Sequence, residues 1–229
     1  MPPLSSSFNG FSRAGLRFLR DLAKNNDRAW FAQRKAIYET ELLEPMRAYV
    51  ADATKALGKA KISLGGDPKR TPFRIYRDTR FSIDKSPYKT NAGVYLTRDG
   101  TRESPGGLYL HVEPKACFVA AGFYRIDKPL LQRWREAMAG EPKRFAAMLR
   151  ALERNGLAVD ESRDELKRMP RGFEAQSASP IATYFRYGSF MVSDMLTDAE
   201  VADPGLIERV VAFAKKSKPL LEYGWALFE

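Results

Sequence analysis

Residues 107–124 have the sequence GLYLHVEPKACFVAAGFY, in which two apolar runs flank a short turn. Both runs are rich in strand-favouring side chains, and Glu113-Pro114-Lys115 joins them, so the stretch predicts a β-hairpin. A further strand is expected over residues 93–97, and short strands over 61–64 and 73–76. Short strands separated by tight turns favour an antiparallel sheet over β–α–β units.

Amphipathic patterns before this middle region predict helices. Ser12 is a candidate N-cap for a helix that ends near Lys24, and Asp27 for a longer one that follows. Pro45 is expected to kink or restart that longer helix.

After the sheet, further helices are expected to begin near residues 127, 142 and 204, with Pro219 ending the last. The sequence therefore predicts an α+β protein with N-terminal helices, a central antiparallel sheet and a helical C-terminal part. We expect residues 1–9 to form a loose tail and residues 10–229 a single domain.

The composition of the 229-residue chain is that of a folded protein, because 44% of its residues are hydrophobic. A single cysteine, Cys117, excludes an intramolecular disulfide framework, and its apolar neighbours predict a buried thiol. The N-terminus does not have the pattern of a secretory signal, and no apolar stretch is long enough to span a bilayer. We therefore expect a cytoplasmic protein without membrane contact.

Positive charge is concentrated in the first half of the chain. The net charge is +10, and residues 1–125 hold 22 Lys and Arg against 12 Asp and Glu. Residues 126–229 hold 16 of each, so the whole excess lies before residue 126. This asymmetry favours an anionic partner, although a well-solvated basic surface would show it as well.

The densest cationic stretch is RIYRDTRFSIDKSPYKT, residues 74–90. It contains five cations and two carboxylates, with aromatic residues set between them, so three positive charges remain even if both carboxylates pair internally. Arginine binds carboxylate or phosphate oxygens with two parallel hydrogen bonds, and lysine acts as a mobile point charge. The stretch therefore predicts an anion site in an ordered loop.

The leading hypothesis is that this segment binds a phosphate- or carboxylate-bearing small molecule. Asp78 and Asp84 would orient the cations. The expected ligand-binding residues are Arg74, Arg77, Arg80, Lys85, Tyr88 and Lys89, with Arg171 and Arg186 in an outer shell. The candidate catalytic residues are Asp78, Asp84, Lys85, Tyr88 and His111. No metal site is predicted, and the sequence identifies no cofactor.

Two other interpretations remain open. The basic half could bind nucleic acid, or the segment could be a structural ion-pair network in a protein-interaction domain, with Asp78 and Asp84 pairing to nearby cations. His111, the only histidine, lies on a predicted strand and is more often structural there. It could be a general base if it shares a face with Arg74, since histidine as a residue type titrates near neutral pH.

The same segment resembles the signature of a bacterial and fungal family called domain of unknown function 2461. In that family an Arg-x-x-Arg-Asp-x-Arg-Phe run leads to Asp-Lys and Pro-Tyr-Lys. The resemblance extends to Trp30-Phe31 and to residues 107–114. The matching positions are Arg74, Arg77, Asp78, Arg80, Phe81, Asp84, Lys85, Pro87, Tyr88 and Lys89, with Asn25-Asn26 and Pro170-Arg171-Gly172-Phe173. It implies the same choice of site and no particular reaction.

Overall fold

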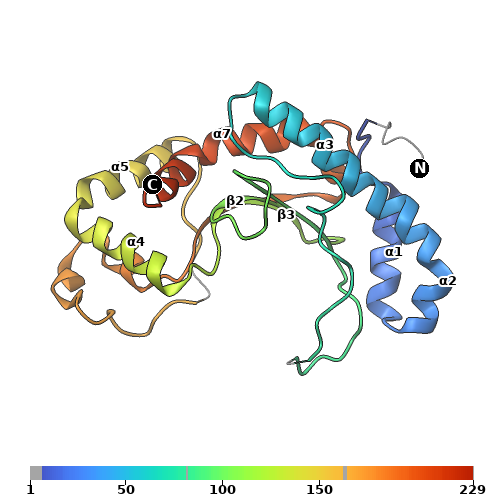
Figure 1. Ribbon diagram of the computed structural model, residues 1–229, viewed down its shortest axis with the longest axis horizontal. Helices are drawn as coiled ribbons and strands as arrows, with labels where there is room; N and C mark the ends of the chain where they lie inside the picture. The colour runs from blue at the N-terminus through green and yellow to red at the C-terminus, as the bar shows by residue number, and fades with distance from the viewer. Residues whose placement is uncertain (1–6, 81, 162–163, 229) are drawn as a thin grey trace. The chain divides into compact units, whose positions relative to one another are not determined.

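The fold contains one sheet of four antiparallel strands in the order β1-β2-β3-β4 (Figure 1). The computed structural model describes residues 7–80, 82–161 and 164–228, and it confirms the α+β class. The strands are β1 (Ala92–Thr97), β2 (Gly107–Val112), β3 (Cys117–Phe123) and β4 (Phe190–Leu196). The predicted hairpin of residues 107–124 is therefore confirmed as β2 and β3.

By its internal contacts the chain divides into two compact units. The first contains the described residues up to Ser104, together with Tyr109–Val119 and Asp194–Ala212. The second contains Pro105–Leu108, Ala120–Ser193 and the described residues from Phe213 onward. The single domain expected over residues 10–229 stays a prediction.

The first unit begins with the helices α1 (Arg13–Lys24), α2 (Arg28–Tyr38) and α3 (Glu44–Lys59). Their starts follow the predicted caps, because Ser12 accepts a hydrogen bond from the Gly15 N–H and Asp27 accepts one from the Trp30 N–H.

A π-helical turn, η1 (Glu39–Leu43), joins α2 to α3, and Pro45 lies in the first turn of α3. The first turn is where a missing N–H costs least, so the predicted restart at Pro45 is confirmed.

Strand β2 has one buried face and one half-buried face. In β2, Leu110 and Val112 are buried, whereas Tyr109 and His111 keep part of their surface exposed. This alternation follows from the two-residue period of a strand. Helix α3 packs on β1.

The second unit contains α4 (Lys128–Gly140), α5 (Pro142–Arg154) and the 3₁₀ turns η2 (Glu174–Ala178) and η3 (Ala182–Arg186). Its core is aromatic: Trp134 stacks on Phe190 with ring centroids 4.2 Å apart, and Phe145 packs edge-on against Tyr223. Helix α6 (Asp198–Val201) belongs to the first unit and begins at the Thr197–Glu200 capping box. Helix α7 (Leu206–Trp225) has its first residues in the first unit and the rest in the second.

Three sequence-based expectations were wrong. Residues 61–64 and 73–76 are not regular strands. Isolated bridges flank them at Gly65 and Pro72, and Tyr76 within the second stretch forms an isolated bridge with Tyr88. Strand β4 was not predicted. Helix α7 continues through Pro219, because Leu220 and Leu221 beyond it are fully buried and packing offsets the lost backbone hydrogen bond.

The N-terminal segment is packed from Phe8 onward. Phe8 is buried, and its N–H donates to Asp52 Oδ2 at 2.8 Å. The tail predicted over residues 1–9 therefore does not include Phe8, and residues 1–6 lie outside the described residues. Among the described helices, none combines the length and the apolar character needed to cross a bilayer.

Candidate functional site

Residues 74–90 form a hairpin, here called the cationic hairpin, that Figure 1 shows reaching away from the sheet. Its two arms are held together at the base, where Tyr76 and Tyr88 form an isolated antiparallel bridge. The Arg77 N–H donates to the Pro87 carbonyl at 2.9 Å, and the Lys89 N–H donates to the Ile75 carbonyl at 2.7 Å. The cations of the segment are thus presented on one paired structure; Phe81 lies outside the described residues.

The base of the cationic hairpin is fastened to the turn between α1 and α2. Asn26 Nδ2 donates to the Tyr88 carbonyl at 3.0 Å, and Asn26 Oδ1 accepts from the Tyr88 N–H at 3.1 Å. The Tyr88 ring stacks on Phe31 with centroids 4.1 Å apart. Burial and the neighbouring Tyr76 raise the pKa of Tyr88, so its phenol stays protonated at neutral pH.

The two carboxylates of the hairpin pair within the hairpin itself. Asp78 accepts two hydrogen bonds from Arg80, at 3.0 and 2.7 Å, and these lower the pKa of Asp78 to about 2. Asp84 pairs with Arg77. The Ser86 hydroxyl, bonded to Asp84 at 2.5 Å, contributes most to lowering the pKa of Asp84. Both carboxylates are therefore ionised at neutral pH and orient arginines.

A hollow of about 410 Å³ opens beside the hairpin. Three of its lining side chains are cationic and none is acidic. The Lys85 ammonium donates a hydrogen bond to the Thr79 carbonyl at 3.0 Å, and an ammonium carries three N–H groups in all. The lining residues are Arg28, Tyr76, Arg77, Thr79, Lys85, Pro87 and Tyr88.

Lys89 and Arg74 lie at the base of the hairpin, outside this lining. The Lys89 ammonium donates to the Arg74 carbonyl at 3.1 Å and lies 5.4 Å from the centroid of the Phe73 ring. The Arg102 guanidinium covers the same ring at 4.7 Å. Burial, followed by the charges of Arg102, Arg74 and Arg77, lowers the pKa of Lys89. Positive potential is therefore concentrated at this end as well.

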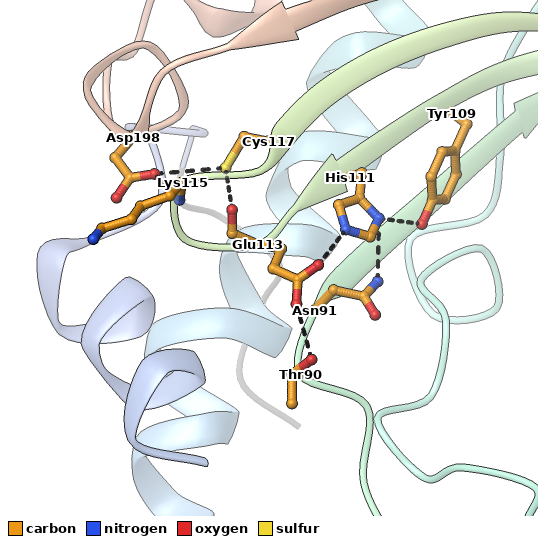
Figure 2. A network of polar contacts seen from close by, with 8 residues as sticks. All are labelled: Thr90, Asn91, Tyr109, His111, Glu113, Lys115, Cys117 and Asp198. Carbon is orange, nitrogen blue, oxygen red and sulfur yellow. Dashed lines mark hydrogen bonds and ion pairs between the residues drawn. The ribbon is translucent and has the colours of Figure 1, made fainter. Parts of the chain in front are cut away.

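A second polar cluster, here called the His111 network, joins the end of the cationic hairpin to β2 (Figure 2). The Tyr109 hydroxyl lies 2.9 Å from His111 Nδ1, and Asn91 Nδ2 lies 3.4 Å from the same nitrogen. His111 Nε2 lies 3.1 Å from Glu113 Oε2, and the Thr90 hydroxyl donates to Glu113 Oε1 at 2.9 Å. His111 therefore lies at the base of the cationic hairpin.

The turn after β2 is also polar, but it has a structural role. The Cys117 thiol donates to the Glu113 carbonyl at 3.1 Å, and the Lys115 N–H donates to Asp198 Oδ1 at 2.8 Å (Figure 2). Burial raises the pKa of Cys117 to about 11, which makes it a poor nucleophile, as the sequence predicts.

The structure brings most of the predicted site residues together. Arg74, Arg77, Arg80, Lys85, Tyr88 and Lys89 share the cationic hairpin. The remaining two, Arg171 and Arg186, belong to the second unit, where Arg186 pairs with Glu165 at 2.7 Å. Their contribution to an outer shell stays a prediction.

Sequence reasoning missed Arg28 and Asn26 as site residues. Asn26 lies in the turn between α1 and α2, and Arg28 is the first residue of α2. Asn26 bonds to the hairpin and Arg28 lines the hollow beside it, although both lie far before the hairpin in sequence. The only signal for this turn was the Asn25-Asn26 pair in the family resemblance.

The structure thus defines a class of protein: an α+β fold in which a cationic hairpin leads into the first strand of the sheet. The family profile described as Conserved hypothetical protein (DUF2461) matches residues 14–223, and the chain belongs to this family. No curated protein and no solved structure gives a significant match to the chain.

Proposed function

We propose that the hollow of the cationic hairpin binds a phosphate- or carboxylate-bearing small molecule. The observation that carries this proposal is the charge of the lining, where Arg28, Arg77 and Lys85 face the hollow without a lining carboxylate. Cations gathered in this way attract an anion and hold it with charge-assisted hydrogen bonds. A volume of about 410 Å³ falls within the range of about 300–1,000 Å³ that small-molecule sites occupy.

Three of the lining residues have distinct parts in the proposed site. Arg77, oriented by Asp84, presents a planar guanidinium for paired hydrogen bonds, and Lys85 adds a mobile point charge. Tyr76 has 57% of its surface exposed and offers a flat apolar wall. Arg74, Arg80 and Lys89 raise the local positive potential from outside the lining.

Thermal unfolding with added anions tests the proposal. Pyrophosphate, adenosine monophosphate and citrate are titrated separately into the wild type, Lys85→Ala and Arg28→Ala, and this separates phosphate from carboxylate ligands. At a concentration 100 times Kd, a bound anion stabilises the wild type by about 2.7 kcal/mol and raises Tm. Each variant is expected to weaken binding by about tenfold or more, because one charge-assisted contact is lost.

Lys55→Ala is the matched control, since it removes the same unit of charge from an exposed position on α3. Its response to each anion should equal that of the wild type. A wild type that no anion stabilises would remove the proposal, as would a Lys55→Ala variant that loses binding as strongly as Lys85→Ala does.

A second candidate function is nucleic-acid binding, which the exposed side chains of the hairpin favour. Tyr76 and the fully exposed Ile83 accompany the cations on a projecting structure. Aromatic side chains beside cations can stack bases while the cations bind phosphates. The test is the fluorescence anisotropy of a labelled single-stranded oligonucleotide between about 50 and 200 mM salt, where contacts to many phosphates give a steep log–log slope. No binding at the low-salt end would exclude this candidate.

A further inference from the structure

We propose that Tyr109 is a catalytic nucleophile activated by His111 and Glu113, and that it acts on phosphate esters bound beside Lys89. This site lies on β2 and does not depend on the hollow of the cationic hairpin. It is a serine-type triad with a phenol in place of the aliphatic hydroxyl. The roles are nucleophile for Tyr109, general base for His111 and positioning residue for Glu113.

The partners of the imidazole determine which nitrogen carries the proton. An ionised carboxylate only accepts hydrogen bonds, so Glu113 Oε2 requires a proton on His111 Nε2. The Asn91 amide nitrogen only donates, so His111 Nδ1 carries the lone pair. The Tyr109 hydroxyl, 2.9 Å from Nδ1, is therefore the donor of that hydrogen bond. This is the direction that general-base activation of a hydroxyl requires.

Glu113 is itself held in place. The Thr90 hydroxyl donates to its second carboxylate oxygen at 2.9 Å, and the Cys117 thiol donates to its backbone carbonyl. The imidazole ring stacks on Phe118 with centroids 4.6 Å apart. The ring orientation is thus fixed from two sides, as is typical of a base that serves one nucleophile.

The environment of Tyr109 makes this base necessary. Burial, followed by the charge of Glu113, raises the pKa of Tyr109 to about 12, so the free phenolate is scarce at neutral pH. The hydroxyl can react only if its proton is removed as the new bond forms, and His111 Nδ1 is in contact to accept it. The Tyr109 hydroxyl packs directly over Gly93, and only glycine leaves room for it, because a Cβ there would lie 2.8 Å from the hydroxyl oxygen.

The cations that cover Phe73, whose ring packs edge-on against the Tyr109 ring, indicate the class of substrate. The Phe73 ring lies 6.1 Å from the Tyr109 ring, centroid to centroid, and carries Lys89 and Arg102 over it. An anion here relieves the repulsion between these cations, and the Lys89 ammonium has two N–H groups beyond its bond to the Arg74 carbonyl. A phosphate monoester supplies both the negative charge and an electrophilic phosphorus atom.

The proposed step is a balanced transfer. The Tyr109 oxygen forms a bond to phosphorus, and the bond between phosphorus and the ester oxygen breaks. The Tyr109 proton moves to His111 Nδ1, which later returns it to solvent. The departing alkoxide leaves on the opposite side of phosphorus, takes a proton from solvent water and is released as an alcohol. The products are phosphotyrosine and the alcohol, and no oxidant, reductant or additional reactant is consumed.

Labelling with benzenesulfonyl fluoride tests the activation without a known substrate. The phenol oxygen bonds to sulfur, fluoride leaves, and His111 accepts the proton. Peptide mass spectrometry then gives the labelling rate of each tyrosine. Tyr95 is the internal control, because burial raises its pKa to about 12 as well and no histidine bonds to it among the described residues. Tyr109 is expected to react about 100 times faster than Tyr95, because general-base catalysis accelerates a reaction by about 100-fold or more.

His111→Gln and Glu113→Gln are expected to bring the Tyr109 rate down towards that of Tyr95, while Tyr95 itself stays unchanged. Phenyl phosphate is expected to protect Tyr109 in the wild type and to lose this effect in Lys89→Met. Equal rates at Tyr109 and Tyr95 in the wild type would overturn the proposal even if a variant failed to fold. Rapid labelling without protection by phenyl phosphate would overturn the assignment of phosphate esters.

Discussion

The cationic hairpin and the His111 network are neighbours along the chain, yet they hold their charged groups in opposite ways. Asp78 and Arg80 pair near the hairpin tip with 61% and 77% of their side chains exposed. The His111 side chain is 15% exposed and sits within a chain of hydrogen bonds on β2. Water competes for exposed pairs, so they add little stability. A partly buried network instead fixes geometry, which proton transfer needs.

The largest expected effect separates the anchored tyrosine of the hairpin from the exposed one. Tyr88→Ala removes a buried ring that stacks on Phe31, so the free energy of unfolding in urea should fall by about 3–5 kcal/mol. Tyr76→Ala, across the bridge, should change it by no more than about 0.5 kcal/mol. Similar losses for both variants would mean that the hairpin is not anchored at Tyr88.

The next prediction concerns the attachment of the hairpin to the turn between α1 and α2. Asn26→Ala removes two hydrogen bonds to the backbone of Tyr88 and should lower the free energy of unfolding by about 2 kcal/mol. Asn25→Ala is the matched control, since its side chain makes one exposed bond, to the Asp21 carbonyl. Amide exchange at Lys89 should accelerate only in Asn26→Ala, and equal exchange in both variants would contradict the attachment.

The third prediction compares a hydrogen bond of the His111 network with an exposed hydrogen bond of the same chemistry, and a smaller effect is expected. Thr90→Val removes the hydroxyl that donates to Glu113 and should cost about 1 kcal/mol. Thr101→Val removes a similar bond, to the Asp99 carboxylate in an exposed turn, and should have the smaller effect. Urea unfolding of both variants measures the difference, and a larger loss for Thr101→Val would reverse the comparison.

The smallest expected effect is the acid dependence of the exposed hairpin pair. Arg80 lowers the pKa of Asp78 from 3.8 to about 2, so ionised Asp78 favours the folded state above pH 3.8. This stabilisation is lost as the pH falls through about 2. Asp78→Asn should therefore flatten the fall of Tm slightly in this range, and added salt should reduce the difference. A wild type and variant that differ equally at pH 3.8 and at about 2 would contradict the assigned pair.

The sequence predicted those parts of the fold that local pattern determines. The hairpin of residues 107–124 is predictable because two runs of strand-favouring residues flank Pro114, which cannot continue a strand. Strand β4 was missed because Ser193 and Met195 are exposed on a strand whose pairing partner, β3, is about seventy residues earlier. Helix α7 was cut short because burial beyond Pro219 is a tertiary effect.

The candidate site was predictable to a similar extent. Charge density alone located the cationic hairpin, whereas the contributions of Arg28 and Asn26 depend on how the helices fold back. Tyr109, His111 and Glu113 could have been grouped from sequence, because alternate residues of a strand share a face. Thr90 could not, since its contact with Glu113 joins separate segments.

The two hydrogen bonds between Asn26 and Tyr88 restrict where the hairpin can change in length. A side-chain amide that both donates to and accepts from one residue substitutes for a neighbouring strand at that single position. Sliding the arm that carries Tyr88 by one residue would break both bonds and turn the Tyr88 ring away from Phe31. Insertions are therefore tolerable near the tip, around Ile83. An insertion between Ser86 and Tyr88 would instead break the attachment of this arm to Asn26 and Phe31.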